Sequence, residues 1–207
     1  MTVKNLPHSR LRKRFSAALV VLLALSGAVA GGEGGLTCPA ERAVYRLDSD
    51  EGPLEVGFVP SRGRASIASD LYLYLTTVQR TYWFSFSVSN GYSGMTLIPV
   101  SDPRAEAARE NGPALLLETR RMDEGLINEV LVSLRFYALD EKLGFLFEPP
   151  ASGMTAPPMV MMPEIGLTLW YEPQALTEDR SADRDPIPRG IFRLTKCLSE
   201  ARPAAYP

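Results

Sequence analysis

Histidine is almost absent from this sequence. Its 207 residues include a single one, His8, which lies in an N-terminal segment that we expect to be removed. A chain without imidazole cannot build a Ser-His-Asp or Cys-His catalytic set, and it offers no histidine ligand to zinc, copper or haem iron. The commonest general base at neutral pH is also missing. We therefore expect a binding protein with no catalytic residues, no metal and no cofactor rather than an enzyme.

Acidic residues are absent from residues 1–15, which carry five Lys and Arg residues. The uncharged run 16–30 follows and ends in the small residues Ala28 and Ala30. This order is typical of a secretory signal peptide. An uncleaved membrane anchor is the alternative, but a run of about 15 residues falls short of a membrane span. Lipid attachment at Cys38 is disfavoured because that cysteine lies too far beyond the apolar run.

We therefore expect residues 1–30 to be a signal peptide and the remainder to be periplasmic or secreted, with no stable membrane span after cleavage. Without residues 1–30 the chain keeps 17 of its 22 Lys and Arg residues and all 24 Asp and Glu residues, so its formal net charge falls from −2 to −7. Such an acidic chain is a poor partner for nucleic acid or an anionic membrane.

Cysteine is scarce as well. The two cysteines, Cys38 and Cys197, lie near the two ends of the chain that remains after cleavage. In an oxidising compartment an even pair predicts a disulfide, whereas redox and metal-binding pairs usually lie two residues apart. The bridge would join the ends of one domain. We expect that domain to span residues 31–200 and the Pro- and Ala-rich tail 201–207 to be loose.

The rest of the sequence consists mostly of short β-type runs, which predict strands and which alternate with a period of two in 70–76, 81–89 and 129–139. They are 43–47, 54–59, 70–76, 81–89, 95–100, 114–119, 129–139, 143–147, 165–172 and 191–196. Asn90-Gly91 predicts a hairpin between two of them. A helix is the alternative for part of 122–134, where apolar residues recur every four positions.

Helix signals are few. Asp102 as a cap, Pro103 at the first position and Gly112 beyond the end predict one short surface helix. Five prolines exclude regular structure from 149–163. The sequence thus predicts a mainly β fold, a single-domain antiparallel sandwich or barrel with one short surface helix and termini joined by a disulfide.

Large aromatic residues suggest a contact surface. Tyr72, Tyr74 and Trp83 fall on the strand faces opposite the regular apolar positions. If the apolar face is core, these aromatics are available to a protein partner or a small apolar ligand. A sheet that is buried on both faces is the competing interpretation.

A second set of contact residues comes from the Pro-rich segment, whose methionines Met159, Met161 and Met162 offer an adaptable apolar surface. Thioethers can also hold Cu(I), although the usual His and Cys ligands are missing. The alternative function is a histidine-free hydrolase that uses two carboxylates, for example on glycans. The acidic pairs Asp123-Glu124, Asp140-Glu141 and Glu178-Asp179 are candidates only because they are acidic, and a solvated turn is the competing interpretation of each.

Overall fold

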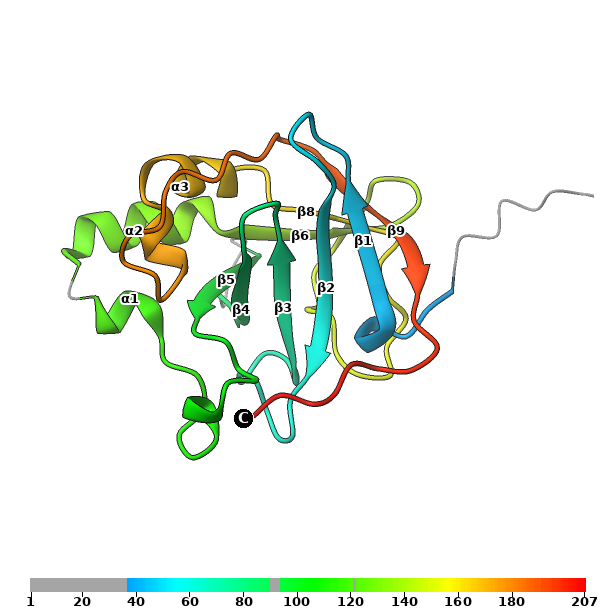
Figure 1. Cartoon of the computed structure of the whole chain (residues 1–207). Helices are drawn as coiled ribbons and strands as arrows, with labels where there is room; N and C mark the ends of the chain where they lie inside the picture. Colours follow the sequence, from blue (N-terminus) through cyan, green and yellow to red (C-terminus); the bar gives the residue numbers. More distant parts are fainter. Residues whose placement is uncertain (1–36, 90–93, 121) are drawn as a thin grey trace, which may run out of the picture. The chain divides into compact units, whose positions relative to one another are not determined.

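The computed structural model describes residues 37–89, 94–120 and 122–207, and in this part of the chain eight strands form a closed antiparallel barrel (Figure 1). In barrel order the strands are β1 (Ala43–Leu47), β2 (Leu54–Pro60), β3 (Leu71–Thr76), β4 (Thr81–Val88), β5 (Met95–Val100), β6 (Arg135–Leu139), β8 (Met159–Met161) and β9 (Ile191–Cys197). The β1–β9 and β5–β6 pairings close the ring. The two-residue strand β7 (Phe145–Leu146) pairs with β6 outside it. The predicted mainly β fold is confirmed, as a barrel rather than a sandwich.

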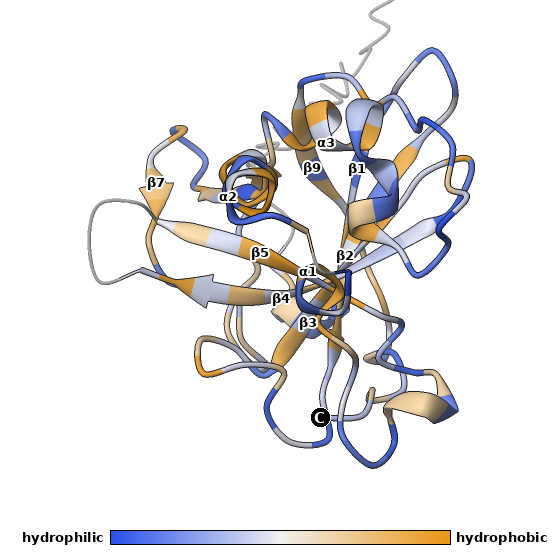
Figure 2. Cartoon of the chain, turned by 90° about the vertical axis from the view of Figure 1, so that its left-hand side faces the viewer, coloured by the Kyte–Doolittle hydropathy of each residue, from blue (hydrophilic) through white to orange (hydrophobic). Residues whose placement is uncertain are grey.

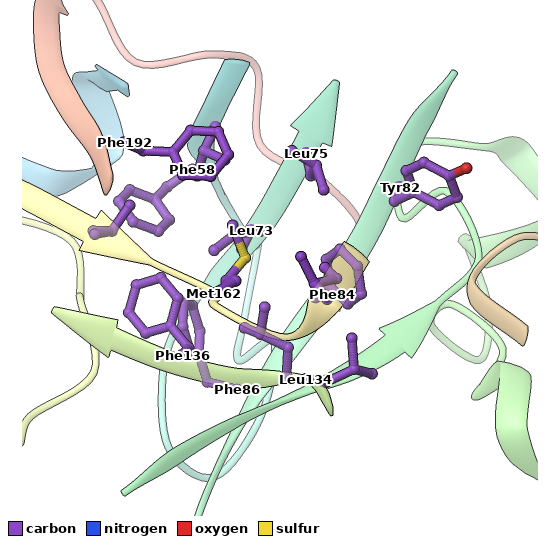
Figure 3. Packing of buried hydrophobic residues seen from close by; sticks show 14 of the residues in the cluster. Phe58, Leu73, Leu75, Tyr82, Phe84, Phe86, Leu134, Phe136, Met162 and Phe192 are labelled. Carbon is purple, nitrogen blue, oxygen red and sulfur yellow. The ribbon is translucent and has the colours of Figure 1, made fainter. Parts of the chain in front are cut away.

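Alternation along the strands decides which side chains fill the barrel. Leu71, Leu73 and Leu75 of β3 join the interior cluster, as do the alternate aromatic residues of β4, while the residues between them face outward. Figure 3 shows side chains from opposite walls of the barrel pointing toward one another. The expected division of β3 and β4 into two faces is confirmed, because a period of two places successive side chains on opposite sides of a sheet.

Aromatic rings pack tightly in the interior. Phe86 and Phe136 meet edge to face with their ring centroids 5.3 Å apart, and Tyr45 and Phe58 do so at 5.8 Å. The one polar group of this set is satisfied, since the Tyr45 hydroxyl donates to the Pro157 carbonyl at 2.9 Å. These side chains fill the barrel, so its interior is a packed core rather than a ligand cavity.

Three α-helices occur among the described residues: α1 (Leu116–Thr119), α2 (Glu124–Ser133) and α3 (Ile165–Tyr171). All three lie on one side of the barrel in Figure 1. The predicted strands 114–119 and 165–172 were wrong, and 129–139 is a strand only from Arg135 onward.

Segment 165–172 shows why the strand prediction failed. Its apolar residues alternate, as in a strand, but Ile165 and Leu169 are also four residues apart and can therefore share one face of a helix. Both are fully buried in the core, whereas Leu167 and Tyr171 are left exposed. In so short a run, the same apolar residues fit both a strand period of two and a helical spacing of four. Packing of Ile165 and Leu169 against the barrel core selects the helix.

The helix predicted after Asp102 reduces to one 3₁₀ turn, Glu106–Ala108. The Asp102 carboxylate accepts hydrogen bonds from the backbone and the guanidinium of Arg104, at 2.8 and 3.1 Å. This local turn replaces the expected helix cap. Gly112 does adopt a positive φ of 73°, and a Cβ there would clash with the backbone oxygen of Pro207.

The Pro-rich segment 149–163 contains regular structure after all. β8 (Met159–Met161) begins directly after Pro158 and pairs with β6 and β9. Proline is tolerated at a strand end because it need not donate to the ladder there. The prediction that prolines exclude regular structure is therefore wrong for Met159–Met161, a strand that the barrel needs for closure.

Both ends of the domain are tied down. The predicted disulfide between Cys38 and Cys197 is present, with an S–S distance of 2.07 Å. The tail 201–207, expected to be loose, is instead hydrogen-bonded to two other segments: Ala205 exchanges backbone hydrogen bonds with Pro60 and Arg62, and Tyr206 donates to the Pro103 carbonyl at 2.9 Å. In Figure 1 the tail passes the lower ends of β2 and β3.

The predicted signal peptide 1–30 and the Asn90-Gly91 turn lie outside the described residues, although β4 and β5 pair as that turn predicts. No helix in the described ranges has both the length and the apolar character that a membrane crossing requires.

Removing the disulfide tests its contribution. The Cys38→Ser/Cys197→Ser variant should lose about 2–5 kcal/mol of unfolding free energy, because the bridge closes a very long loop in the unfolded chain. Guanidinium unfolding followed by circular dichroism measures this. Reductant should bring the wild-type midpoint to that of the variant and leave the variant unchanged; equal midpoints without reductant would refute the claim.

Candidate functional site

An apolar groove runs between α2 and α3. It has a volume of about 500 Å³, and its apolar lining comes from Leu126, Val130, Val132, Leu167 and Tyr171. Both helices carry hydrophobic residues in Figure 2. Val132, Leu167 and Tyr171 are 60%, 48% and 69% exposed. Three large apolar side chains that gather around one depression and remain this open to water are the mark of a contact surface rather than of a core.

Buried hydroxyl groups hold the two helices together below the groove. The Ser133 and Thr168 hydroxyls lie 2.5 Å apart, and the Ser133 hydroxyl also contacts the Val130 carbonyl at 2.8 Å. Both residues are buried. Because buried hydroxyls are costly to leave unpaired, this contact fixes the helix spacing and keeps the groove preformed.

The local sequence explains both helices. The Asp123 carboxylate accepts a hydrogen bond from the Leu126 backbone at 2.9 Å and so caps α2. In α3, Gly166 lies where a Cβ would come within 2.9 Å of the Ile187 carbonyl oxygen. A larger residue there would push the helix away from the segment that supports it.

Carboxylates supply the charged groups of the groove. Glu129 and Glu172 both line it, and no Lys or Arg among the described residues does. Glu129 is exposed, while the Glu172 carboxylate accepts a hydrogen bond from the Gln174 amide at 3.0 Å. The groove therefore combines apolar walls with a negatively charged margin.

The aromatic residues chosen from the sequence lie elsewhere, on the outer face of β3 and β4. Tyr72, Tyr74 and Trp83 are only 1%, 4% and 5% exposed. They form a small outer cluster with Val59, Val100 and the tail residue Ala205. The sheet is thus buried on both faces at this point, as the competing interpretation held, and the tail provides the cover.

Arginine side chains cover what the tail leaves open. Arg104 stacks over Trp83 with its guanidinium carbon 4.4 Å from the ring centroid, and Arg202 stacks over Tyr74 at 4.8 Å. Both arginines line a polar concavity of about 220 Å³ that includes these two aromatic residues. We call this region the arginine–aromatic face; a third stacked pair, Arg62 over Tyr206, completes it.

Tyr74 is held at the centre of this face. Its hydroxyl donates to the Glu55 carboxylate at 2.9 Å and accepts from Arg202 at 2.6 Å. Its ring lies against Gly57, where an added Cβ would come within 2.5 Å of the Tyr74 hydroxyl oxygen. Burial raises the pKa of the Tyr74 phenol to about 12, with Arg202 opposing and Glu55 reinforcing the shift.

The three methionines are not brought together with these aromatics. Met162 packs inside the barrel (Figure 3), and Met159 is buried with its sulfur 3.2 Å from a guanidinium nitrogen of Arg193. Met161 is half-buried. Three strands separate β8 from β3 in either direction around the barrel. The six residues predicted to share one contact surface therefore lie on opposite sides of the barrel or within it.

The described ranges contain no group of three or more His, Cys, Asp or Glu residues placed to hold an ion. The sequence reasoning missed the groove because it assigned α3 to a strand. It missed the arginines because nothing in the local sequence around Arg62, Arg104 or Arg202 shows that they meet.

Fold and surface together define the class of this protein: an eight-stranded antiparallel barrel with a packed interior, a terminal disulfide and an external helical groove. Comparison with models of protein families, with curated protein sequences and with solved structures found no match.

The packing role of Trp83 can be measured. Trp83→Ala should cost about 3 kcal/mol of unfolding free energy, because the variant opens a hole beneath Arg104 and the tail. The matched variant Trp170→Ala, which removes a side chain that is 39% exposed, should cost about 1 kcal/mol. Urea unfolding of both variants provides the comparison, and similar losses would show that Trp83 is not a packing residue.

Alkaline solution should unfold the protein through its buried tyrosines. Burial raises the pKa of Tyr72 and of Tyr74 to about 12, from 10.0 for the free phenol. Below pH 10 both states keep the phenolic proton, so stability is unaffected. Between pH 10 and 12 the unfolded chain loses that proton first, and the unfolding free energy falls as pH rises.

Absorbance of phenolate at 295 nm and circular dichroism, followed together from pH 8 to 12.5, test this. The fall in stability should be shallower for Tyr74→Phe than for the wild type. An equally steep fall in both proteins would show that Tyr74 ionises as readily when folded as when unfolded.

Proposed function

We propose that this chain is an exported, non-catalytic binding domain that holds an amphipathic segment of a partner protein in the groove between α2 and α3. The observation that carries the proposal is the group of exposed apolar side chains Val132, Leu167 and Tyr171 around a preformed depression. Contact between these apolar side chains and water is unfavourable in the free protein. A partner that covers them would gain about 25 cal/mol of binding free energy for each Å² of apolar surface buried.

Charge indicates the character of the partner. Glu129 and Glu172 line the groove together with its apolar residues. We therefore expect tighter binding of a segment whose apolar side chains are flanked by basic residues. Exposed apolar side chains from two helices suit an extended or helical segment of a protein. A small apolar ligand is the competing occupant, since the volume falls within the range of small-molecule sites.

Export supports this proposal in two ways. The disulfide joins the ends of the domain, and such bridges persist in oxidising compartments outside the cytoplasm. Residues 1–30 have the composition of a secretory signal. We propose that the domain works in the periplasm or outside the cell.

Two labelled peptides test the partner. One is an amphipathic Leu/Lys peptide, and the other is its Leu/Glu counterpart; fluorescence anisotropy gives both dissociation constants. We expect the basic peptide to bind at least tenfold more tightly. Leu167→Gln should weaken that binding at least tenfold, because Leu167 lines the groove. Val78→Gln, at a 63% exposed apolar residue outside the groove lining, should change it less than twofold.

The neutral dye Nile red separates the two occupants. If the dye binds with the same dependence on Leu167 while neither peptide binds, the groove takes a small apolar ligand and the partner proposal is wrong. If Leu167→Gln and Val78→Gln behave alike, the groove is not the binding site at all.

A carboxylate-dependent hydrolase is the second candidate, because Glu129 and Glu172 line one concavity. The walls between them are mostly apolar and offer few donors to sugar hydroxyls, and Glu129 is exposed rather than held in an apolar pocket. General acid catalysis by a carboxyl group relies on the apolar kind of environment. Binding is therefore the function that the groove supports better.

A further inference from the structure

We propose that the arginine–aromatic face is a binding site for a phosphate-type oxyanion, separate from the helical groove. Three arginines, Arg62, Arg104 and Arg202, line one concavity of about 280 Å³ together with Pro203, Ala204 and Tyr206. Among the described residues, no Asp or Glu is part of that lining. Such a concentration of guanidinium groups stands out in a chain whose formal net charge is negative.

Aromatic stacking orients all three guanidinium groups. Each lies over a ring, with its central carbon 4.4 to 4.8 Å from the ring centroid. Stacking covers one face of the planar group and leaves its edge, where the N–H donors lie, to meet an acceptor. A bound anion therefore finds donors whose orientation is already restricted, which lowers the entropy cost of binding.

Internal contacts leave donors available. The Asp102 carboxylate accepts hydrogen bonds from Nε and one Nη of Arg104. One Nη of Arg202 donates to the Glu55 carboxylate and to the Tyr74 hydroxyl. Within the described residues, no carboxylate lies in salt-bridge range of Arg62. Since a guanidinium carries five N–H donors, most donors of Arg62 and several of the other two can reach a ligand in the concavity.

The charge and shape of the site favour a phosphate group over a carboxylate. A tetrahedral oxyanion can accept from several forked guanidinium edges at once, whereas a planar carboxylate is matched by a single fork. A phosphate monoester also carries about −1.5 to −2 charges near neutral pH, enough to offset more than one arginine.

The phosphate could belong to a free metabolite or to a lipid headgroup. Ile67, 98% exposed, lies in the loop that joins β2 to β3, five residues after Arg62. An exposed apolar side chain on the loop that also carries Arg62 would enter the lipid layer if the phosphate were a headgroup. A free phosphate would make no use of Ile67, so this residue distinguishes the two sources.

Trp83 reports on the site directly. The sequence contains two tryptophans, so Trp170→Phe leaves Trp83 as the only one. Sodium phosphate, added at constant ionic strength with sodium chloride as balance, should produce a saturable change in Trp83 emission, with calorimetry as the second measure of affinity. Arg62→Gln and Arg104→Gln should each weaken binding at least tenfold. Arg189→Gln removes an exposed arginine outside the site and should change affinity less than twofold.

Vesicles decide the source of the phosphate. The site binds a lipid headgroup if the protein sediments with phosphatidylcholine vesicles that contain phosphatidic acid but not with vesicles of pure phosphatidylcholine. The Ile67→Ser variant should then no longer sediment with the acidic vesicles. Saturable phosphate binding without sedimentation would assign the site to a free ligand. The proposal is overturned if neither phosphate nor the acidic vesicles bind, or if Arg62→Gln and Arg104→Gln bind as tightly as Arg189→Gln.

Discussion

Packing inside the barrel is the interaction on which the rest of the structure depends. Strands both near and far in the sequence contribute rings to one interior: Tyr45 of β1 meets Phe58 of the next strand, β2, and Phe86 of β4 meets Phe136 of β6. Filling this space requires the ring of strands to close, and closure requires the short strand β8 between β6 and β9. Hydrophobic burial therefore stabilises a strand within a Pro-rich segment that local preference disfavours.

Because the interior is full, any ligand must bind outside it. Two outer surfaces differ in character for a physical reason. At the helices, the barrel buries Ile165 and Leu169 and so turns Leu167 and Tyr171 toward water. On β3 and β4, period-two alternation turns large aromatics outward, and the tail and stacked arginines cover them. The first surface is apolar with acidic margins and suits a basic amphipathic segment; the second is cationic and suits an oxyanion.

Predictions from the sequence were correct where residue type and short-range spacing decide the structure. The strands from 43 to 100 follow from short runs of β-forming residues, and the disulfide follows from an even pair of cysteines in a chain that we expect to be exported. Segment 165–172 was wrongly assigned to a strand because a run of fewer than ten residues can satisfy both periods. The aromatic contact residues were chosen from alternation alone, which locates the outer face of a sheet but not what covers it.

From the sequence alone came the β character of the fold, its two-faced strands and the bridge between its ends, because each depends on residue type or on short-range spacing. Only the tertiary structure decided that the sheet closes into a barrel, that α3 is a helix, and that Arg62, Arg104 and Arg202 meet around one concavity. These features arise from contacts between residues distant in the chain, and the free energy that selects them comes from burial that no local segment contains.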